Sequence, residues 1–152
     1  MPIFFRDAVF VNNSSIDMIS NYAFDDVLAA KFAVEKTDDV CMAKQLERAS
    51  LSYKVGQYLM IDYKEMPMFG KVEAFVCMPS ESEWYVVVQC LNTVQYDSHF
   101  HSYVVENCNP TQFRVVSFAE LIDSHPVCGY KKTRRNKIVH FIRLQYHVLP
   151  RV

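Results

Sequence analysis

Three runs of apolar residues follow one another closely in the middle of the chain, at 53–61, 68–76 and 84–91. Each run is rich in β-branched and aromatic residues, which is typical of β-strands. Gly56 and Gly70, two of the chain's three glycines, lie near the beginning of the first two runs. A glycine inside a strand pattern often marks a bend. The pattern therefore predicts a mainly β fold, a small and strongly bent antiparallel β-barrel.

The third run contains three consecutive valines at 86–88. Such a continuous apolar stretch indicates a strand that is buried on both faces. Further strands are predicted at 40–48, 102–105, 113–117, 127–130 and 137–144. The first of them has an alternative, because Met42, Leu46 and Ala49 would also line one face of a helix. The alternation that follows favours the strand.

One or two short helices accompany the strands. An Asp-Asp pair at 25–26 precedes a stretch of good helix formers. Acidic residues stabilise a helix N-terminus, so we predict a helix at 24–35. Ser117 is followed three residues later by Glu120, the spacing of a capping box. It predicts a single helical turn, which the His-Pro pair at 125–126 ends.

Polar segments separate these elements, and the most polar of them, at 131–136, reads as a hairpin tip. The others are at 62–67, 79–83, 95–102 and 107–110. A chain of 152 residues has the size of one ordinary domain. We therefore expect a single domain over 1–152, with an N-terminal arm or cap at 1–39 and the barrel core at 40–149.

Composition indicates a soluble protein of a reducing compartment. The chain is 51% hydrophobic and 22% charged, and no apolar run approaches the ~20 residues of a membrane span. The first residues lack the basic-then-apolar order of a signal peptide. The five cysteines form no Cys-x-x-Cys motif, and Cys77 and Cys90 lie in apolar runs. We expect a nuclear or cytoplasmic protein without a membrane partner.

Charge is distributed unevenly, although the formal net charge is −1. Residues 1–100 carry 8 lysines and arginines against 14 acidic residues, a net charge of −6. Residues 101–152 carry 8 against 3, a net charge of +5. The basic C-terminal part is able to orient the protein on an anionic partner.

The sharpest charge feature is a set of five cations within seven positions. They are Lys131, Lys132, Arg134, Arg135 and Lys137. Such a set is able to neutralise several phosphates of a nucleic acid. These contacts would position the protein on the backbone without reading sequence. The alternatives are a solvated hairpin loop and a run that resembles a nuclear-import signal.

Several aromatic residues suggest a cage for a methylated ammonium group, held by cation–π attraction. The candidates are Trp84, Tyr85 and Tyr96, supported by Tyr58 and Tyr63. A neighbouring acid, Asp62, Glu83 or Asp97, would add a complementary charge. The alternative, which we favour, is that these rings pack in the core.

The chain also contains donors for zinc, namely His99, His101, Cys108, His125 and Cys128. The spacing from His125 to Cys128 is that of metal ligands, but the usual Cys-x-x-Cys knuckle is absent. No nucleophile elbow, P-loop or Rossmann glycine motif occurs. We therefore expect no metal, no cofactor and no enzymatic activity.

The order of motifs resembles that of a bromo-adjacent homology (BAH) domain. The opening strand of the family is matched by Val55-Gly-Gln-Tyr-Leu-Met-Ile61, and the next by Phe69-Gly-Lys-Val-Glu-Ala-Phe75. The aromatic strand corresponds to Trp84-Tyr-Val-Val-Val88, and the late turn to Glu120-Leu-Ile-Asp-Ser124. Valines at 86–88 replace the polar aromatic residues of members that bind methyl-lysine. The resemblance therefore implies a nuclear interaction module with a BAH/SH3-like barrel.

The chain is also similar to the β-rich C-terminal domain of transposon-derived animal proteins. The shared motifs are Gly56-Gln-Tyr58, Phe69-Gly-Lys-Val72 and Leu121-Ile-Asp-Ser-His125-Pro126. Together the two resemblances cover about residues 52–147. They imply a chromatin or transposon-derived context.

These observations predict a non-catalytic protein-interaction module in the nucleus. One alternative is nucleic-acid binding through the basic segment 131–137. Another is a self-associating structural domain, because an open barrel exposes strand edges and Phe4-Phe5 forms an apolar arm.

Overall fold

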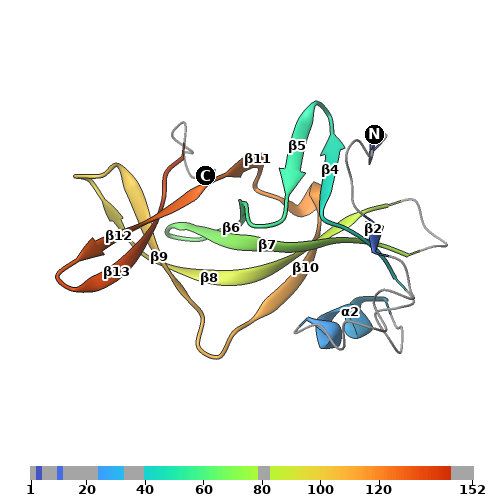
Figure 1. Cartoon of the computed structure of the whole chain (residues 1–152), viewed down its shortest axis with the longest axis horizontal. Coiled ribbons are helices and arrows are strands. Elements are labelled where there is room, and N and C mark those ends of the chain that lie inside the picture. Colours follow the sequence, from blue (N-terminus) through green and yellow to red (C-terminus); the bar gives the residue numbers. More distant parts are fainter. Residues whose placement is uncertain (1–2, 5–9, 12–23, 33–39, 79–82, 145–152) are drawn as a thin grey trace.

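The computed structural model describes residues 3–4, 10–11, 24–32, 40–78 and 83–144 of the chain. Figure 1 shows a strongly curved sheet with a helix at one end. That helix, α2 (Asp25–Phe32), confirms the helix predicted from the Asp-Asp pair. Most of the predicted N-terminal arm, including Phe5, lies outside the described residues.

The sheet is antiparallel throughout the described strands, which confirms a mainly β fold. The described strands are β1 (Ile3–Phe4), β2 (Phe10–Val11), β3 (Cys41–Ala43), β4 (Gln45–Arg48), β5 (Leu51–Lys54), β6 (Tyr58–Tyr63), β7 (Pro67–Cys77), β8 (Tyr85–Asp97), β9 (Ser102–Asn107), β10 (Phe113–Ser117), β11 (Asp123–Val127), β12 (Gly129–Arg134) and β13 (Lys137–Ile142).

The strand order of the main sheet, which we call its main path, is β11-β6-β7-β8-β9-β13-β12. β10 pairs with β8, and β3 lies between β2 and β7. β1, β4 and β5 form a smaller sheet. Within the described residues no pairing joins β11 to β12, so a closed barrel is not found.

Strand β8 is the longest element and connects two parts of the sheet. Its first half lies between β7 and β10, and its second half pairs with β9 from Leu91 to Asp97, with a register irregularity between Thr93 and Gln95. The three valines at 86–88 are fully buried, which confirms a strand covered on both faces. The predicted polar loop at 95–102 is wrong in its first part, because β8 continues to Asp97. Backbone pairing with β9 holds these polar residues in the strand.

Buried side chains of the described residues form three clusters. The central cluster contains Phe75 and Trp84 and lies on one face of β7 and β8. A second cluster, around Leu28 and Val87, lies on the opposite face, where α2 covers it. A third, around Phe69, connects the body to β9 and β13. The apolar residues of the predicted strands are therefore buried on both faces of one curved sheet.

The strand predicted at 53–61 is divided by a turn. Gly56 has a φ of 95°, a value that favours glycine, and its N–H donates to the carbonyl of Val72 over 2.9 Å. β5 ends before this turn and β6 begins after it. The segment at 40–48 forms two strands, β3 and β4, so the strand interpretation is confirmed over the helical one.

The capping box forms a single turn, as predicted. Ser117 donates from its N–H and its Oγ to Glu120 Oε1, over 3.4 and 3.1 Å, at the start of the 3-10 turn η2 (Phe118–Glu120). The His-Pro pair at 125–126 was predicted to stop this turn, and that is wrong. Both residues lie within β11. This strand ends the main path, and proline is tolerated on an edge strand because it has no N–H to pair.

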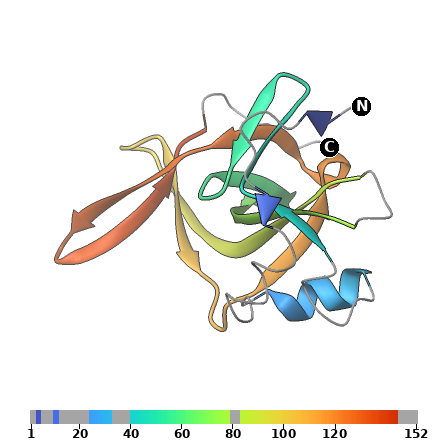
Figure 2. The same ribbon diagram turned by 45° about the vertical axis from the view of Figure 1, so that its right-hand side comes forward.

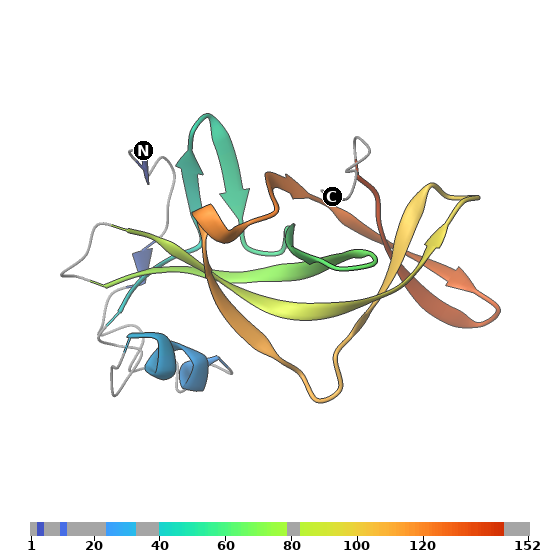
Figure 3. The same cartoon turned by 180° about the vertical axis from the view of Figure 1, so that it is seen from behind.

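Two hairpins project from the end of the molecule opposite α2. One is formed by β8 and β9, and the other by β12 and β13 (Figures 1 and 3). Figure 2 shows the β12–β13 hairpin standing clear of the curved body. The basic segment of the sequence therefore lies on an outlying part of the fold.

Candidate nucleic-acid interface

The β12–β13 hairpin carries all five cations of the basic segment. Its strands are joined by a two-residue turn, in which Arg135 and Asn136 have φ values of 51° and 65°. Two successive positive φ angles are typical of the primed turns that join tightly paired strands. The predicted tip at 131–136 is therefore mostly strand, and only its last two residues form the turn. Residues 131–138 are all exposed.

The pairing register divides the cations between two faces. Directly opposed residues of an antiparallel pair share a face, and Lys137 is opposite Arg134. Alternation along β12 places Lys132 on that same face and Lys131 on the other. We call the face with Lys132, Arg134 and Lys137 the outer face of the hairpin. It carries three of the five cations.

The β8–β9 turn packs against the outer face. The Phe100 ring lies 5.2 Å from the ring of Phe141, which in turn stacks on Tyr130 at 5.3 Å. The Lys132 ammonium lies 4.3 Å from the centre of the Phe100 ring, and the Arg134 guanidinium 5.6 Å. Cation–π attraction at these distances restrains both side chains. Lys132 and Arg134 are thus backed by an aromatic layer.

Asp97 fixes this arrangement. Its Oδ1 accepts the N–H groups of His99 and Phe100 over 3.0 and 3.1 Å, and its Oδ2 accepts from Arg134 Nη1 over 2.8 Å. The backbone N–H of Phe100, followed by the Arg134 guanidinium, lowers the pKa of the Asp97 carboxyl. Arg143 also donates to the Phe100 carbonyl over 2.7 Å. The turn is therefore held by charged groups from both hairpins.

The positive charge of the hairpin is largely uncompensated. Within the described part of the chain, Arg134 is the one cation of the five with an ion pair. The other four are exposed and have no carboxylate within ion-pair distance among the described residues. They are Lys131, Lys132, Arg135 and Lys137. Four solvated cations on one projecting hairpin present a site for a polyanion.

The opposite face of the hairpin differs because it meets the body. Lys131 is opposite His140, whose ring lies 5.1 Å from that of Tyr58. Burial, followed by the charges of Lys131 and Lys71, lowers the pKa of His140. Its imidazole is therefore neutral at physiological pH and adds nothing to the positive surface.

The residues of the predicted aromatic cage are not brought together. Trp84 is 5% exposed in the central cluster. Tyr85 packs with the second cluster, where its ring contacts Phe32 at 5.2 Å. Tyr96 lies near the far end of β8 and contacts Tyr103 at 5.0 Å. The three side chains belong to three different surroundings.

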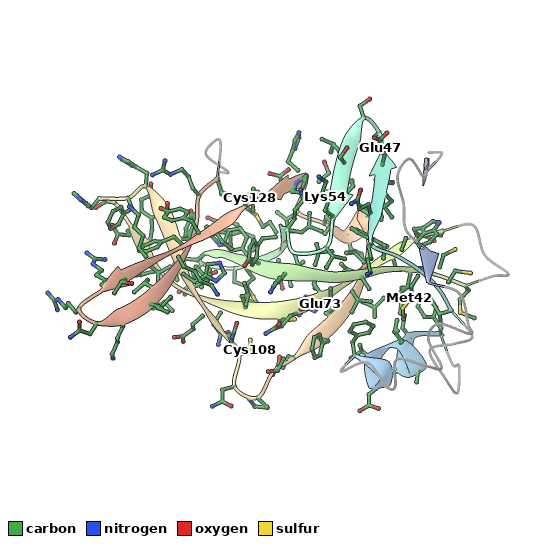
Figure 4. The ribbon with its side chains drawn as sticks, in the orientation of Figure 1. Met42, Glu47, Lys54, Glu73, Cys108 and Cys128 are labelled. Atoms are coloured by element: carbon green, nitrogen blue, oxygen red, sulfur yellow. The ribbon has the colours of Figure 1, made fainter. Side chains whose placement is uncertain are left out.

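The predicted zinc donors are also spread over the molecule. His99 and His101 lie in the β8–β9 turn, whereas His125 lies on β11 beside Asp123, 3.0 Å from its Oδ1. Figure 4 shows Cys108 and Cys128 well apart. In the described ranges, no group of three or more histidines, cysteines or acids is placed to hold a metal ion.

Sequence reasoning missed three contributors to this site. Phe100, Tyr130 and Arg143 were not singled out, and Asp97 was considered only as an acid beside a cage. A period of two at Tyr130, Lys132 and Arg134 could have indicated a common face. The contribution of Phe100 depends on packing between distant segments, which the sequence pattern does not show.

Comparison with protein-family models, curated proteins and solved structures finds no match to this chain. The resemblances to BAH and transposon-derived domains therefore stay predictions. Among the described residues, no helix is long and apolar enough to cross a membrane.

Proposed function

We propose that this protein is a non-catalytic binding domain that attaches to the phosphate backbone of nucleic acid through its β12–β13 hairpin. One observation carries the proposal: four exposed cations project on a hairpin without a carboxylate partner among the described residues. Their phosphate contacts would be independent of base sequence. This is the nucleic-acid alternative predicted from the basic segment, and the exposure of that segment on the hairpin supports it.

The aromatic residues behind the cations favour binding to the phosphates of a duplex over stacking of unpaired bases. The Phe100 ring is occupied by Phe141 and by the ammonium of Lys132. A base that stacked on Phe100 would have to displace that lysine. The ring therefore serves to orient cations, which lowers the entropy lost when they meet phosphates.

An opposing explanation is that these lysines protect a strand edge. β12 is the last strand of the main path, and lysines on edge strands prevent pairing between molecules. This explanation predicts no affinity for nucleic acid above that of any other lysine-bearing surface. A matched pair of variants distinguishes nucleic-acid binding from protection of the strand edge.

The test measures binding of a fluorescent duplex by anisotropy over a series of salt concentrations. The hairpin variant combines Lys131→Ala, Lys132→Ala and Lys137→Ala. The control combines Lys44→Ala, Lys54→Ala and Lys64→Ala, which removes three exposed lysines of the body. We expect the hairpin variant to lose about 10-fold or more in affinity and to flatten the salt slope by about 2–3. Equal losses in both variants would refute the proposal.

A second candidate is the protein-interaction module of BAH type, in a chromatin or transposon-derived setting in the nucleus. It is supported by Ile138, a large apolar side chain that is 74% exposed on the same hairpin. Val94 and Tyr96 are exposed on the second half of β8. After nuclease treatment of an extract, we expect the wild type to retain a protein partner that Ile138→Ser loses. Retention of the same partner by both would count against it.

Self-association is the third function predicted from the sequence, and it stays a prediction. Light scattering over a range of protein concentrations tests it directly. A monomeric mass that does not change with protein concentration would refute self-association.

A further inference from the structure

Cys41 on β3 and Cys77 on β7 stand directly opposite each other in the sheet. Directly opposed residues in an antiparallel pair project to the same face. Packing gives the same result independently, because Cys77 belongs to the central cluster and Cys41 packs against that cluster. Neither forms a disulfide in this structure, and the Cys77 thiol donates to the Met78 carbonyl over 3.3 Å. Two thiols from distant parts of the chain are thus neighbours on one face.

We propose that Cys41 and Cys77 are an oxidisable thiol pair that forms a cross-strand disulfide when the protein meets peroxide. Opposed residues of an antiparallel pair have Cα atoms about 4.5 or 5.5 Å apart. A disulfide requires about 4.4–6.8 Å. The Cα separation of an opposed pair therefore already lies in the required range.

The two cysteines differ in access in a way that suits this reaction. Cys41 is half-buried, whereas Cys77 is 7% exposed. The Cys41 thiolate attacks one peroxide oxygen, the O–O bond breaks, and a sulfenic acid forms as hydroxide leaves. The Cys77 thiolate then attacks Cys41 Sγ, the S–S bond forms and a second hydroxide leaves. The thiols lose two electrons, the peroxide gains them, and the thiol protons convert both hydroxides to water.

The bond would change how the N-terminal part of the chain is attached. β3 has three residues, and it lies between β2 and β7. The residue after Cys41, Met42, packs with Phe24 and Leu28 in the second cluster. A disulfide to β7 would therefore tie the layer of β2, β3 and α2 covalently to the body. It would also restrict the unfolded chain, so oxidation should raise the Tm by about 5–10 °C.

The test uses the full chain, reduced and then treated with increasing hydrogen peroxide. Remaining thiols are blocked with N-ethylmaleimide, and peptides are mapped by mass spectrometry without reduction. We expect a peptide that links Cys41 to Cys77, loss of two alkylated sites, a higher Tm, and reversal of all three by dithiothreitol.

The control variants use the other three cysteines. The triple variant Cys90→Ser, Cys108→Ser and Cys128→Ser should form the same link and show the same rise in Tm, whereas Cys41→Ser should do neither. Links confined to Cys90, Cys108 or Cys128 in the wild type would overturn the proposal. So would conversion of Cys41 to sulfinic acid without a link. Mapping of the wild type decides the question even where a variant does not fold.

Discussion

The carboxylate of Asp97 and the guanidinium of Arg134 join two hairpins whose residues lie 37 positions apart in the chain, with Oδ2 and Nη1 separated by 2.8 Å. The same carboxylate accepts the N–H groups of His99 and Phe100 through its other oxygen. One side chain therefore fixes both the β8–β9 turn and the end of β12. Because Phe100 backs Lys132, this contact also helps to set where the basic surface points.

Asp97→Asn should lower the thermal stability at neutral pH, and the loss should vanish in acid. The pKa of Asp97 is lowered in the folded protein. Its stabilisation is therefore fully present above the ordinary aspartate pKa, about 3.9, and is lost as the pH falls through the lower folded value. The measurement is the Tm of wild type and variant from pH 7 to pH 2. Asp62→Asn is the control, because no cation of the described residues pairs with Asp62. A Tm difference that is constant with pH would contradict this account.

Gly70→Ala should destabilise the protein because β7 and β8 approach closely there. A Cβ added to Gly70 would lie 2.6 Å from Val88 Cβ, and Val88 is fully buried. We expect a loss of about 1–3 kcal/mol in the free energy of unfolding by urea. Val88→Ala alone creates a cavity and is also destabilising. The double variant should lose less than the two single losses combined, and strict additivity would show that the contact does not matter.

The strands could be predicted where each apolar run coincides with one strand. The run at 68–76 is β7 with a residue added at each end, and 113–117 is β10. The prediction of one strand over 53–61 was wrong at Gly56, because a glycine in a strand pattern marks either a bulge or a turn. Only the hydrogen bonds to Val72 distinguish the two. A local pattern contains no information about that distant partner.

In the candidate site, too, the local features could be predicted from the sequence and the long-range contacts could not. The five cations were visible as a local run, and their exposure could be expected from their charge. Which face each occupies depends on the register with β13, which the sequence does not specify. The parts played by Phe100 and Asp97 depend on packing between separate hairpins. Long-range contacts therefore account for what was missed in both the fold and the site.

Phe100→Leu should weaken binding of a nucleic-acid duplex without removing a charge. Leucine preserves an apolar cover over Phe141 but has no ring for Lys132 and Arg134. The lost cation–π attraction is worth about 0.5–1 kcal/mol, so affinity should fall about 2–5-fold. The salt slope should stay unchanged, because the number of cations is unchanged. Phe113→Leu, a substitution beside α2 at the other end of the molecule, is the control. A changed slope would mean that Phe100 acts by some means other than ordering the cations.

His140 should titrate below the ordinary histidine pKa, and its protonation should destabilise the fold. Burial is the largest cause of the lowered pKa, followed by the charges of Lys131 and Lys71. The unfolded chain binds the proton more readily, so stability is greatest above about pH 6.5 and declines as the pH falls toward the folded pKa. NMR titration of the imidazole measures the pKa directly. Lys131→Ala should raise it, because Lys131 lies opposite His140, whereas Lys137→Ala on the outer face should leave it unchanged. Equal shifts in both variants would mean that the general field of the hairpin, and not the facing lysine, acts on the ring.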